Sequence, residues 1–214
     1  MERKMDHLKD IQEIRSMMER SSKFISLSGL SGVFAGTFAI VGAVMAYLIM
    51  GRHYNLAGTD SYAQLIADNT EQKTQLFTYF VIDAISVLIA SVSFCFIFTI
   101  RNSKKKGLPI WDHTAKRLLI NLLVPLVTGG LFALALLVHG IVGFIAPVTL
   151  LFYGLALFNA SKYTFEDIRF LGISEIVLGI ISCFFIGFGL IFWTIGFGLM
   201  HIVYGVVMYN KYEK

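Results

Sequence analysis

The chain has 214 residues, of which 56% are hydrophobic and 15% are charged, and its formal net charge at neutral pH is +4. Ordinary soluble domains are about 45–50% apolar with glycine included and about 25% charged, whereas 19 glycines raise the apolar share further here. This composition excludes a soluble enzyme, a disordered tail and a nucleic-acid-binding module. It predicts a polytopic membrane protein.

The first 23 residues have the pattern of an amphipathic helix. Leu8, Ile11, Ile14 and Met18 fall on one arc of a helical wheel, and acidic residues fall on the opposite arc. Basic residues flank the apolar arc, as in helices that lie on an anionic membrane surface. We therefore predict a cytoplasmic amphipathic helix over residues 1–23. It lies on the membrane, docks on a membrane or cytosolic protein partner, or is a solvated extension.

Six apolar segments follow, each long enough to cross a bilayer, which takes about 20 helical residues. We predict an all-α integral membrane protein with one six-helix transmembrane domain over residues 24–214. The predicted spans are 24–50, 76–100, 118–138, 141–160, 171–190 and 191–209.

Lysine and arginine are distributed very unevenly around these spans. Sixteen of the 18 precede the first span, follow the last, or lie in the loops at 101–117 and 161–170, while only Arg52 and Lys73 lie elsewhere. The positive-inside rule then places both termini in the cytoplasm. The spans become three in-out-in hairpins of a plasma-membrane or inner-membrane protein. The basic loop at 101–117 serves topology and lipid anchoring, and it also suits contact with anionic headgroups.

Glycine marks the turns between closely spaced spans. The third and fourth predicted spans join at His139-Gly140, and the fifth and sixth join at the turn Gly187-Phe-Gly189-Leu-Ile.

An internal repeat relates the last two predicted hairpins. The fourth span closes with YGLALFN from Tyr153, and the sixth closes with YGVVMYN from Tyr204. The second span ends more loosely at Asn102, so each even-numbered span is predicted to stop at an Asn near a Lys. Asn is a common helix C-cap, but the shared Tyr-Gly-x-x-x-Phe/Tyr-Asn core exceeds what capping demands and favours duplication.

A family resemblance rests on the last hairpin. The segment Leu171-Gly-x-x-Glu-Ile-x-Leu-Gly179, followed by Phe192-Trp-Thr-Ile-Gly196-Phe-Gly198, is similar to the glycine-punctuated units of small HdeD-type acid-resistance membrane proteins. The resemblance implies a role in stress physiology and transfers no catalytic residue.

Ionisable residues within the predicted spans need a physical reason, because burying a charge near the bilayer centre costs at least about 2.5–3.5 kcal/mol. The candidate polar site residues are Asp83, His201, Glu175 and Asn121. A carboxylate and an imidazole at different depths could form steps of a proton relay. The alternative is that Asp83 is protonated or hydrogen-bonded to another helix and that His201 is an interhelical donor.

Two prolines interrupt the third and fourth predicted spans. Pro125 and Pro147 each remove a backbone hydrogen bond and so free the carbonyls of Asn121 and Gly143. Such carbonyls either coordinate ions or are satisfied locally in a bent helix.

Small residues at four-residue spacing indicate close helix packing. Ser28, Gly32 and Gly36 share a face of the first span, and Gly198 and Gly205 share a face of the sixth. Packing within one protomer and packing between protomers fit this pattern equally well.

The sequence limits function more weakly than architecture. We predict a non-enzymatic stress-response, scaffold or regulatory membrane component, because no nucleophile is paired with a base. The alternative is a small oligomeric channel or transporter for protons, ions or a small solute. Cys95 and Cys183 lie in apolar runs, so neither a disulfide nor a metal site is predicted. No cofactor and no nucleic acid is expected; the expected partners are the lipid bilayer and either a second copy or a protein bound through residues 1–23.

Overall fold

The computed structural model describes residues 24, 26–54, 71–107 and 109–214. The predicted amphipathic helix at 1–23 lies outside the described residues.

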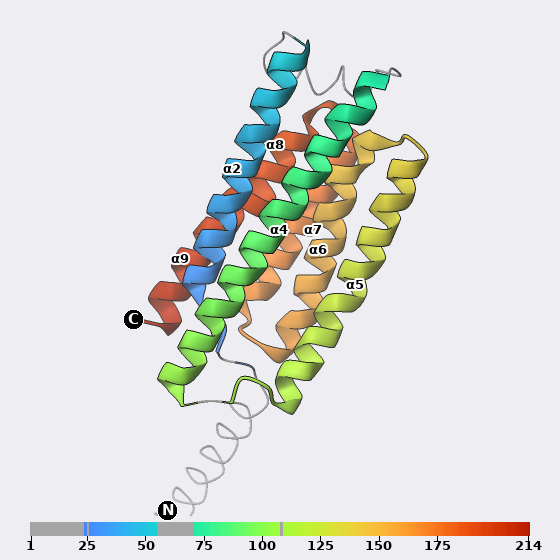
Figure 1. The fold of residues 1–214 in the computed structure, drawn as a ribbon. Coiled ribbons are helices and arrows are strands. Elements are labelled where there is room, and N and C mark those ends of the chain that lie inside the picture. The colour runs from blue at the N-terminus through green and yellow to red at the C-terminus, as the bar shows by residue number, and fades with distance from the viewer. Residues whose placement is uncertain (1–23, 25, 55–70, 108) are drawn as a thin grey trace, which may run out of the picture.

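The described residues form an all-α bundle without a strand (Figure 1). Its first four rods are α2 (Gly29–Tyr54), α4 (Glu71–Lys106), α5 (His113–Val138) and α6 (Ile145–Ala160), the last preceded by the 3-10 turn η1 (Val142–Phe144). After the 3-10 turn η2 (Ser161–Tyr163) comes α7 (Asp167–Phe184). A continuous C-terminal rod follows the turn η3 (Ile186–Phe188) and consists of α8 (Gly189–Trp193), the π-helical segment η4 (Thr194–Met200) and α9 (His201–Tyr212).

Five of these helical stretches are long and apolar enough to cross a membrane. They are Gly29–Met50, Thr78–Lys106, His113–Val138, Val142–Tyr163 and Ile186–Tyr212. The sixth rod, α7, is not among them: its 18 residues include Asp167, Arg169 and Glu175. The helices therefore agree with the all-α, multi-pass architecture predicted from the sequence.

The turn between the last two rods lies earlier than predicted. Helix α7 ends at Phe184 and α8 begins at Gly189, so the predicted boundary at residues 190 and 191 is wrong by several residues. The prediction relied on the two glycines of the turn. Gly189 is however helical, with a φ of −51°, and the chain reverses through the preceding turn η3.

The turn between α5 and α6 lies at the predicted position. Gly140 has a φ of +73°, a conformation that favours glycine. Its N–H donates to Leu137 O at 2.9 Å, and the N–H of Ile141 donates to Leu136 O at 2.8 Å. This pair of bonds is a Schellman motif, which satisfies the last carbonyls of α5.

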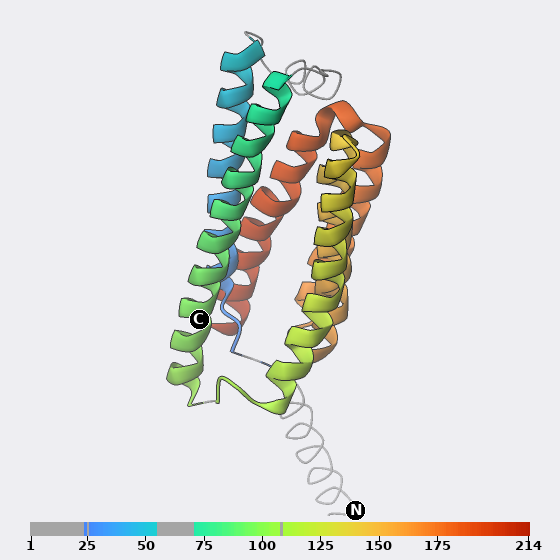
Figure 2. The same ribbon diagram turned by 45° about the vertical axis from the view of Figure 1, so that its right-hand side comes forward.

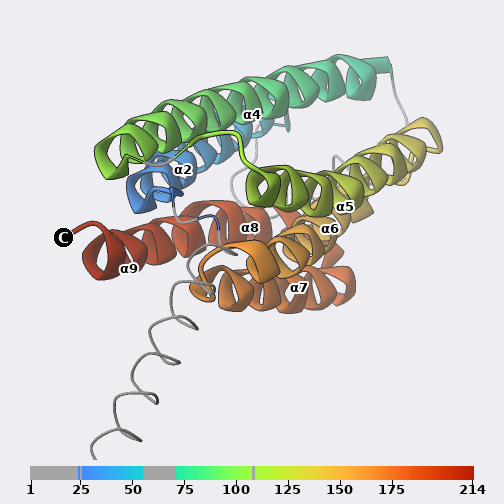
Figure 3. The same cartoon turned by 90° about the horizontal axis from the view of Figure 1, so that it is seen from below.

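The bundle has two groups of helices joined by the C-terminal rod (Figure 2). Helix α2 packs between α4 and α9, while α6 packs between α5 and α7. The C-terminal rod contacts both groups, because α9 and η4 lie on α2 and α8 lies on α6. Seen from below, α4 and α5 belong to different groups (Figure 3).

The glycines of the first and last rods face each other within one protomer. A Cβ atom on Gly32 would lie 3.2 Å from Gly205 Cα, and one on Gly36 would lie 2.5 Å from Gly198 O. The two backbones are therefore nearly in contact, as small residues allow in membrane helices. The structure thus assigns this pattern to packing within the protomer.

Polar side chains hold the segment that leads into α2. Asn102 Nδ2 donates to Ser26 O at 3.1 Å and to Leu27 O at 3.3 Å, and the Thr164 hydroxyl donates to Phe24 O at 2.7 Å. Asn102 is buried in this contact and does not end its helix, because α4 continues to Lys106. The interpretation of Asn102 as a helix stop is therefore wrong.

The two prolines have different positions in their helices. Pro125 lies inside α5 as predicted. Pro147 is the third residue of α6, in a first turn where a backbone N–H has no partner within the helix anyway. The predicted interruption of the fourth span by Pro147 is therefore wrong, since this proline lies in the first turn of α6.

Candidate functional site

A buried carboxylate lies at the centre of the candidate site. The side chain of Glu175 on α7 is 0% exposed, and neither of its oxygens has a hydrogen-bond partner among the described residues. Gly196 of the π-helical segment lies directly against it, where a Cβ atom would collide with Glu175 Oε2. Because Gly196 has no side chain, the carboxylate can pack directly against the backbone of the π-helical segment.

His201, at the start of α9, connects the carboxylate to a third group. Its Nδ1 lies 3.0 Å from Gly196 O and 3.5 Å from Glu175 Oε1, and its Nε2 lies 2.7 Å from the Tyr153 hydroxyl. A carbonyl only accepts hydrogen bonds, so Nδ1 carries a proton. In the neutral imidazole Nε2 then accepts a hydrogen bond from Tyr153. We call Glu175, His201 and Tyr153 the Glu–His–Tyr cluster.

The local helix geometry explains how His201 reaches this position. Residues Thr194–Met200 form a π-helical turn, a wider and rarer geometry that is frequent at functional sites. The Gly196 carbonyl, five residues before His201, accepts from its ring. The ring is further packed by aromatic neighbours, with centroids 5.3 Å away for Tyr153 and 6.0 Å for Phe197.

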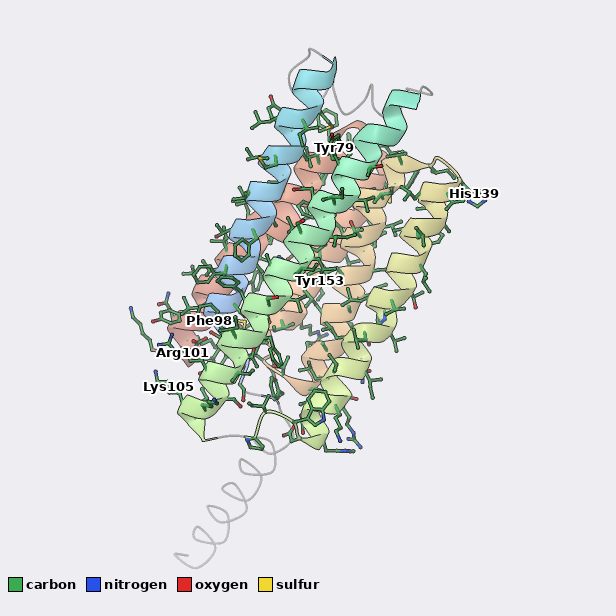
Figure 4. All side chains as sticks on the ribbon, viewed as in Figure 1. Tyr79, Phe98, Arg101, Lys105, His139 and Tyr153 are labelled. Carbon is green, nitrogen blue, oxygen red and sulfur yellow. The ribbon has the colours of Figure 1, made fainter. Side chains whose placement is uncertain are left out.

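The cluster joins three helices in the middle of the bundle. Tyr153 belongs to α6, Glu175 to α7 and His201 to α9. Figure 4 shows Tyr153 about halfway between the end that carries Arg101 and Lys105 and the end that carries His139. We call the end with Arg101 and Lys105 the basic end.

The chemistry available to this arrangement is the holding and transfer of a proton. An ionised carboxylate buried without a partner costs several kcal/mol. Glu175 avoids that cost either by carrying a proton itself or by pairing with a protonated His201. Both states hold one proton more than a bare carboxylate beside a neutral ring. They differ in which group carries it: the Glu175 carboxyl, or Nε2 of His201, which then donates to the Tyr153 hydroxyl.

The other two predicted site residues lie elsewhere. Asp83 on α4 faces α2, where a Cβ atom on Gly42 would lie 3.2 Å from Asp83 Oδ2. The Asn121 amide donates to Arg117 O of its own helix at 2.8 Å. The structure thus brings Glu175 and His201 together and gives Asp83 and Asn121 different neighbours.

Tyr153 was not among the predicted site residues. In the sequence it served only as the first residue of the repeated Tyr-Gly pattern, and its hydroxyl has no charge that would mark it inside a membrane span. Its counterpart Tyr204 packs, as Tyr153 does, against the apolar cluster that contains Leu157, Phe165 and Met208. Tyr153 differs in that its hydroxyl lies 2.7 Å from His201 Nε2.

A second polar group lies at the basic end. Asp167 at the start of α7 accepts hydrogen bonds from Lys211 Nζ at 3.0 Å and from the Tyr212 hydroxyl at 2.5 Å. Burial alone would raise the pKa of Asp167, but these two hydrogen bonds and the charge of Lys211 lower it overall. Glu213 accepts from the Ser28 hydroxyl at 3.1 Å and from the Gly29 backbone N–H. The C-terminal residues thus tie α9 to α7 and cap α2.

No group of three or more His, Cys, Asp or Glu side chains in the described part of the chain is arranged to hold a metal ion. Comparison with known proteins gives no match to any family model, curated protein or solved structure. The HdeD-type resemblance therefore stays a prediction.

Proposed function

We propose that the protein is a non-enzymatic, multi-pass membrane component of regulatory or stress-response type, whose helix packing responds to protonation of the Glu–His–Tyr cluster. The observation that carries the proposal is the Glu175 carboxylate, which is fully buried, has no hydrogen-bond partner among the described residues and lies 3.5 Å from His201 Nδ1.

The proposal includes six membrane crossings in three hairpins, with both termini in the cytoplasm. Helix α7 is the sixth crossing: its 18 residues extend about 27 Å, and it packs along α6. Two of its charges, Asp167 and Arg169, lie in its first turn, while Glu175 is buried against protein. The positive-inside rule supports a cytoplasmic location for the basic end.

Coupling between the proton and helix packing follows from where the cluster lies. Tyr153 and Glu175 belong to the α5–α6–α7 group, whereas His201 belongs to the rod that packs on α2. Loss of the shared proton leaves an uncompensated charge at the contact between the two groups, which weakens that contact.

The test compares melting temperatures of the purified full-length protein in lipid nanodiscs from about pH 5 to about pH 9, the range in which imidazole and perturbed carboxyl groups titrate. We expect the wild-type Tm to vary with pH and Glu175→Gln to flatten the profile, because the amide keeps the volume and cannot ionise. Asp83→Asn makes the same chemical change on α4 and should keep the wild-type profile. Parallel profiles for the wild type and Glu175→Gln would contradict the proposal.

A proton channel or transporter is the second candidate, favoured by the buried carboxylate beside an imidazole, because intramembrane ionisable groups often belong to proton pathways. Proton flux in proteoliposomes distinguishes the two candidates. The regulatory proposal expects no flux above that of empty liposomes. Flux that Glu175→Gln and His201→Ala both abolish, while Asp83→Asn preserves it, would establish transport instead.

A further inference from the structure

Helix α4 is the most exposed crossing in the bundle. None of the residues in its most apolar stretch is buried, and in the corresponding stretch of α5 only 6% of the residues are buried. The main packing partner of α4 is α2, through rings such as Phe94 and Phe98 against Phe34. The remaining apolar surface of α4 therefore contacts lipid, and its 36 residues, about 54 Å long, extend beyond a hydrocarbon core of about 30 Å.

The polar ends of α4 and α5 concentrate positive charge at the basic end. The exposed cations here are Arg101, Lys104 and Lys105 of α4 and Lys116 and Arg117 of α5. None of these five forms an ion pair or side-chain hydrogen bond with the described residues. The acidic residue of this stretch, Asp112, is occupied as the N-cap of α5, where it accepts a hydrogen bond from Ala115 N at 2.6 Å.

Of the four cations on the other side of the basic end, all but Lys214 have protein partners. Lys211 bonds to Asp167 at 3.0 Å, the Arg169 guanidinium lies 5.5 Å from the centre of the Phe158 ring, and Lys162 donates to Asn159 at 3.4 Å. Among the described residues, the unpaired charge is therefore concentrated where α4 ends and α5 begins. Figure 4 shows Arg101 and Lys105 projecting outward from α4.

We propose that the C-terminal end of α4 and the N-terminal end of α5 form a binding surface for anionic glycerophospholipids. The lipid headgroups contact the five unpaired cations, and the acyl chains lie along the exposed apolar surface of α4. Charge complementarity selects this occupant, because each Lys or Arg near an anionic membrane surface attracts it. The two sides of the bundle differ: on the α6–α7–α9 side, where three of the four cations have protein partners, the preference is weaker.

Trp111 provides a reporter for this surface. It lies between α4 and α5, is 62% exposed, and is one of two tryptophans in the chain. In the full-length Trp193→Phe protein, Trp111 becomes the single tryptophan, and its fluorescence is excited selectively over that of the tyrosines. Quenching by brominated phosphatidylglycerol, mixed into phosphatidylcholine bilayers, is compared with quenching by brominated phosphatidylcholine. We expect phosphatidylglycerol to be preferred about tenfold, and the preference to decrease as salt screens the charges.

Two matched double variants test which cations cause the preference for phosphatidylglycerol. Lys104→Gln with Lys105→Gln removes two unpaired charges, and Lys162→Gln with Arg169→Gln removes two charges that have protein partners. We expect the first pair to reduce the preference to about twofold or less and the second pair to leave it unchanged. Lys116→Gln with Arg117→Gln gives a second test should the first pair fail to fold. Equal quenching by the two lipids in the parent protein, or equal losses in the two variant pairs, would overturn the proposal.

Discussion

Gly196 shows how one missing side chain creates a site. A methyl group here would meet Glu175 Oε2 and would lie 2.5 Å from Leu150 Cδ2, and both side chains are fully buried. We expect Gly196→Ala to destabilise the fold by about 1–3 kcal/mol, the usual cost of overpacking. The measurement is thermal unfolding in nanodiscs.

Gly130→Ala is the control for this prediction. Gly130 lies inside α5 with nothing within 4 Å of its Cβ position, and alanine is the better helix former. We expect the Tm of this variant to be equal to or higher than that of the wild type. Equal losses at Gly130 and Gly196 would contradict the close packing of Glu175.

The Asp167 carboxylate gives a prediction for acid pH. The hydrogen bonds from Tyr212 and Lys211 lower its pKa in the folded protein, so the interaction stabilises the fold fully above about pH 4, where an unfolded Asp is ionised. This contribution is lost as the pH falls further. We expect Asp167→Asn to reduce the Tm by a few degrees at most at neutral pH. The difference should vanish in acid, and a difference that persists there would contradict the assignment.

At the scale of whole elements, the contact between α2 and the C-terminal rod depends on glycine. A side chain at Gly36 would collide with Gly198 O and Ile202. We expect Gly36→Leu to separate the two helices and to cost about 3 kcal/mol or more. Thr37→Leu is the control: the neighbouring Thr37 is exposed and, among the described residues, its hydroxyl bonds only to Val33 O of its own helix. Similar melting temperatures for the two variants would contradict this packing.

The two asparagines at 102 and 121 have different structural roles. Asn102 joins α4 to the segment before α2 by two hydrogen bonds, whereas Asn121 bonds within α5. We expect Asn102→Ala to destabilise the protein by about 1–3 kcal/mol, because it leaves a buried carbonyl without its partner. Asn121→Ala should cost less than about 1 kcal/mol in the same melting experiment. A larger loss of stability in Asn121→Ala than in Asn102→Ala would contradict these roles.

For the whole molecule, the proposed topology predicts which ends are accessible from outside the cell. Single cysteines are introduced as Lys105→Cys and His139→Cys, after both native cysteines are changed to alanine. These positions lie at opposite ends of the bundle. We expect a membrane-impermeant maleimide to label intact cells at position 139 and to label position 105 only after lysis. The opposite pattern would invert the topology.

The sequence alone determined the architecture, because a lipid bilayer permits few backbone structures. Apolar segments of about 20 residues must be helices if every backbone hydrogen bond is to be made in a bilayer. The five apolar helices and the left-handed glycine between α5 and α6 were therefore predictable from composition and local pattern. The turn before α8 was predicted only to within several residues, because Gly187 lies in it whereas Gly189 already belongs to α8.

Only the tertiary structure decided which polar and small residues meet. Glu175 and His201 were both candidates, but their separation of 26 residues along the chain contains no information on helix rotation. Rotation places Glu175 beside Gly196, turns Tyr153 toward His201 and leaves Asp83 against α2. The small residues at four-residue spacing in the first and last spans gave no decision either, since the same spacing serves packing within one protomer and between protomers. Composition and periodicity therefore specify which segments enter the membrane, while close packing between helices far apart in the sequence specifies the site.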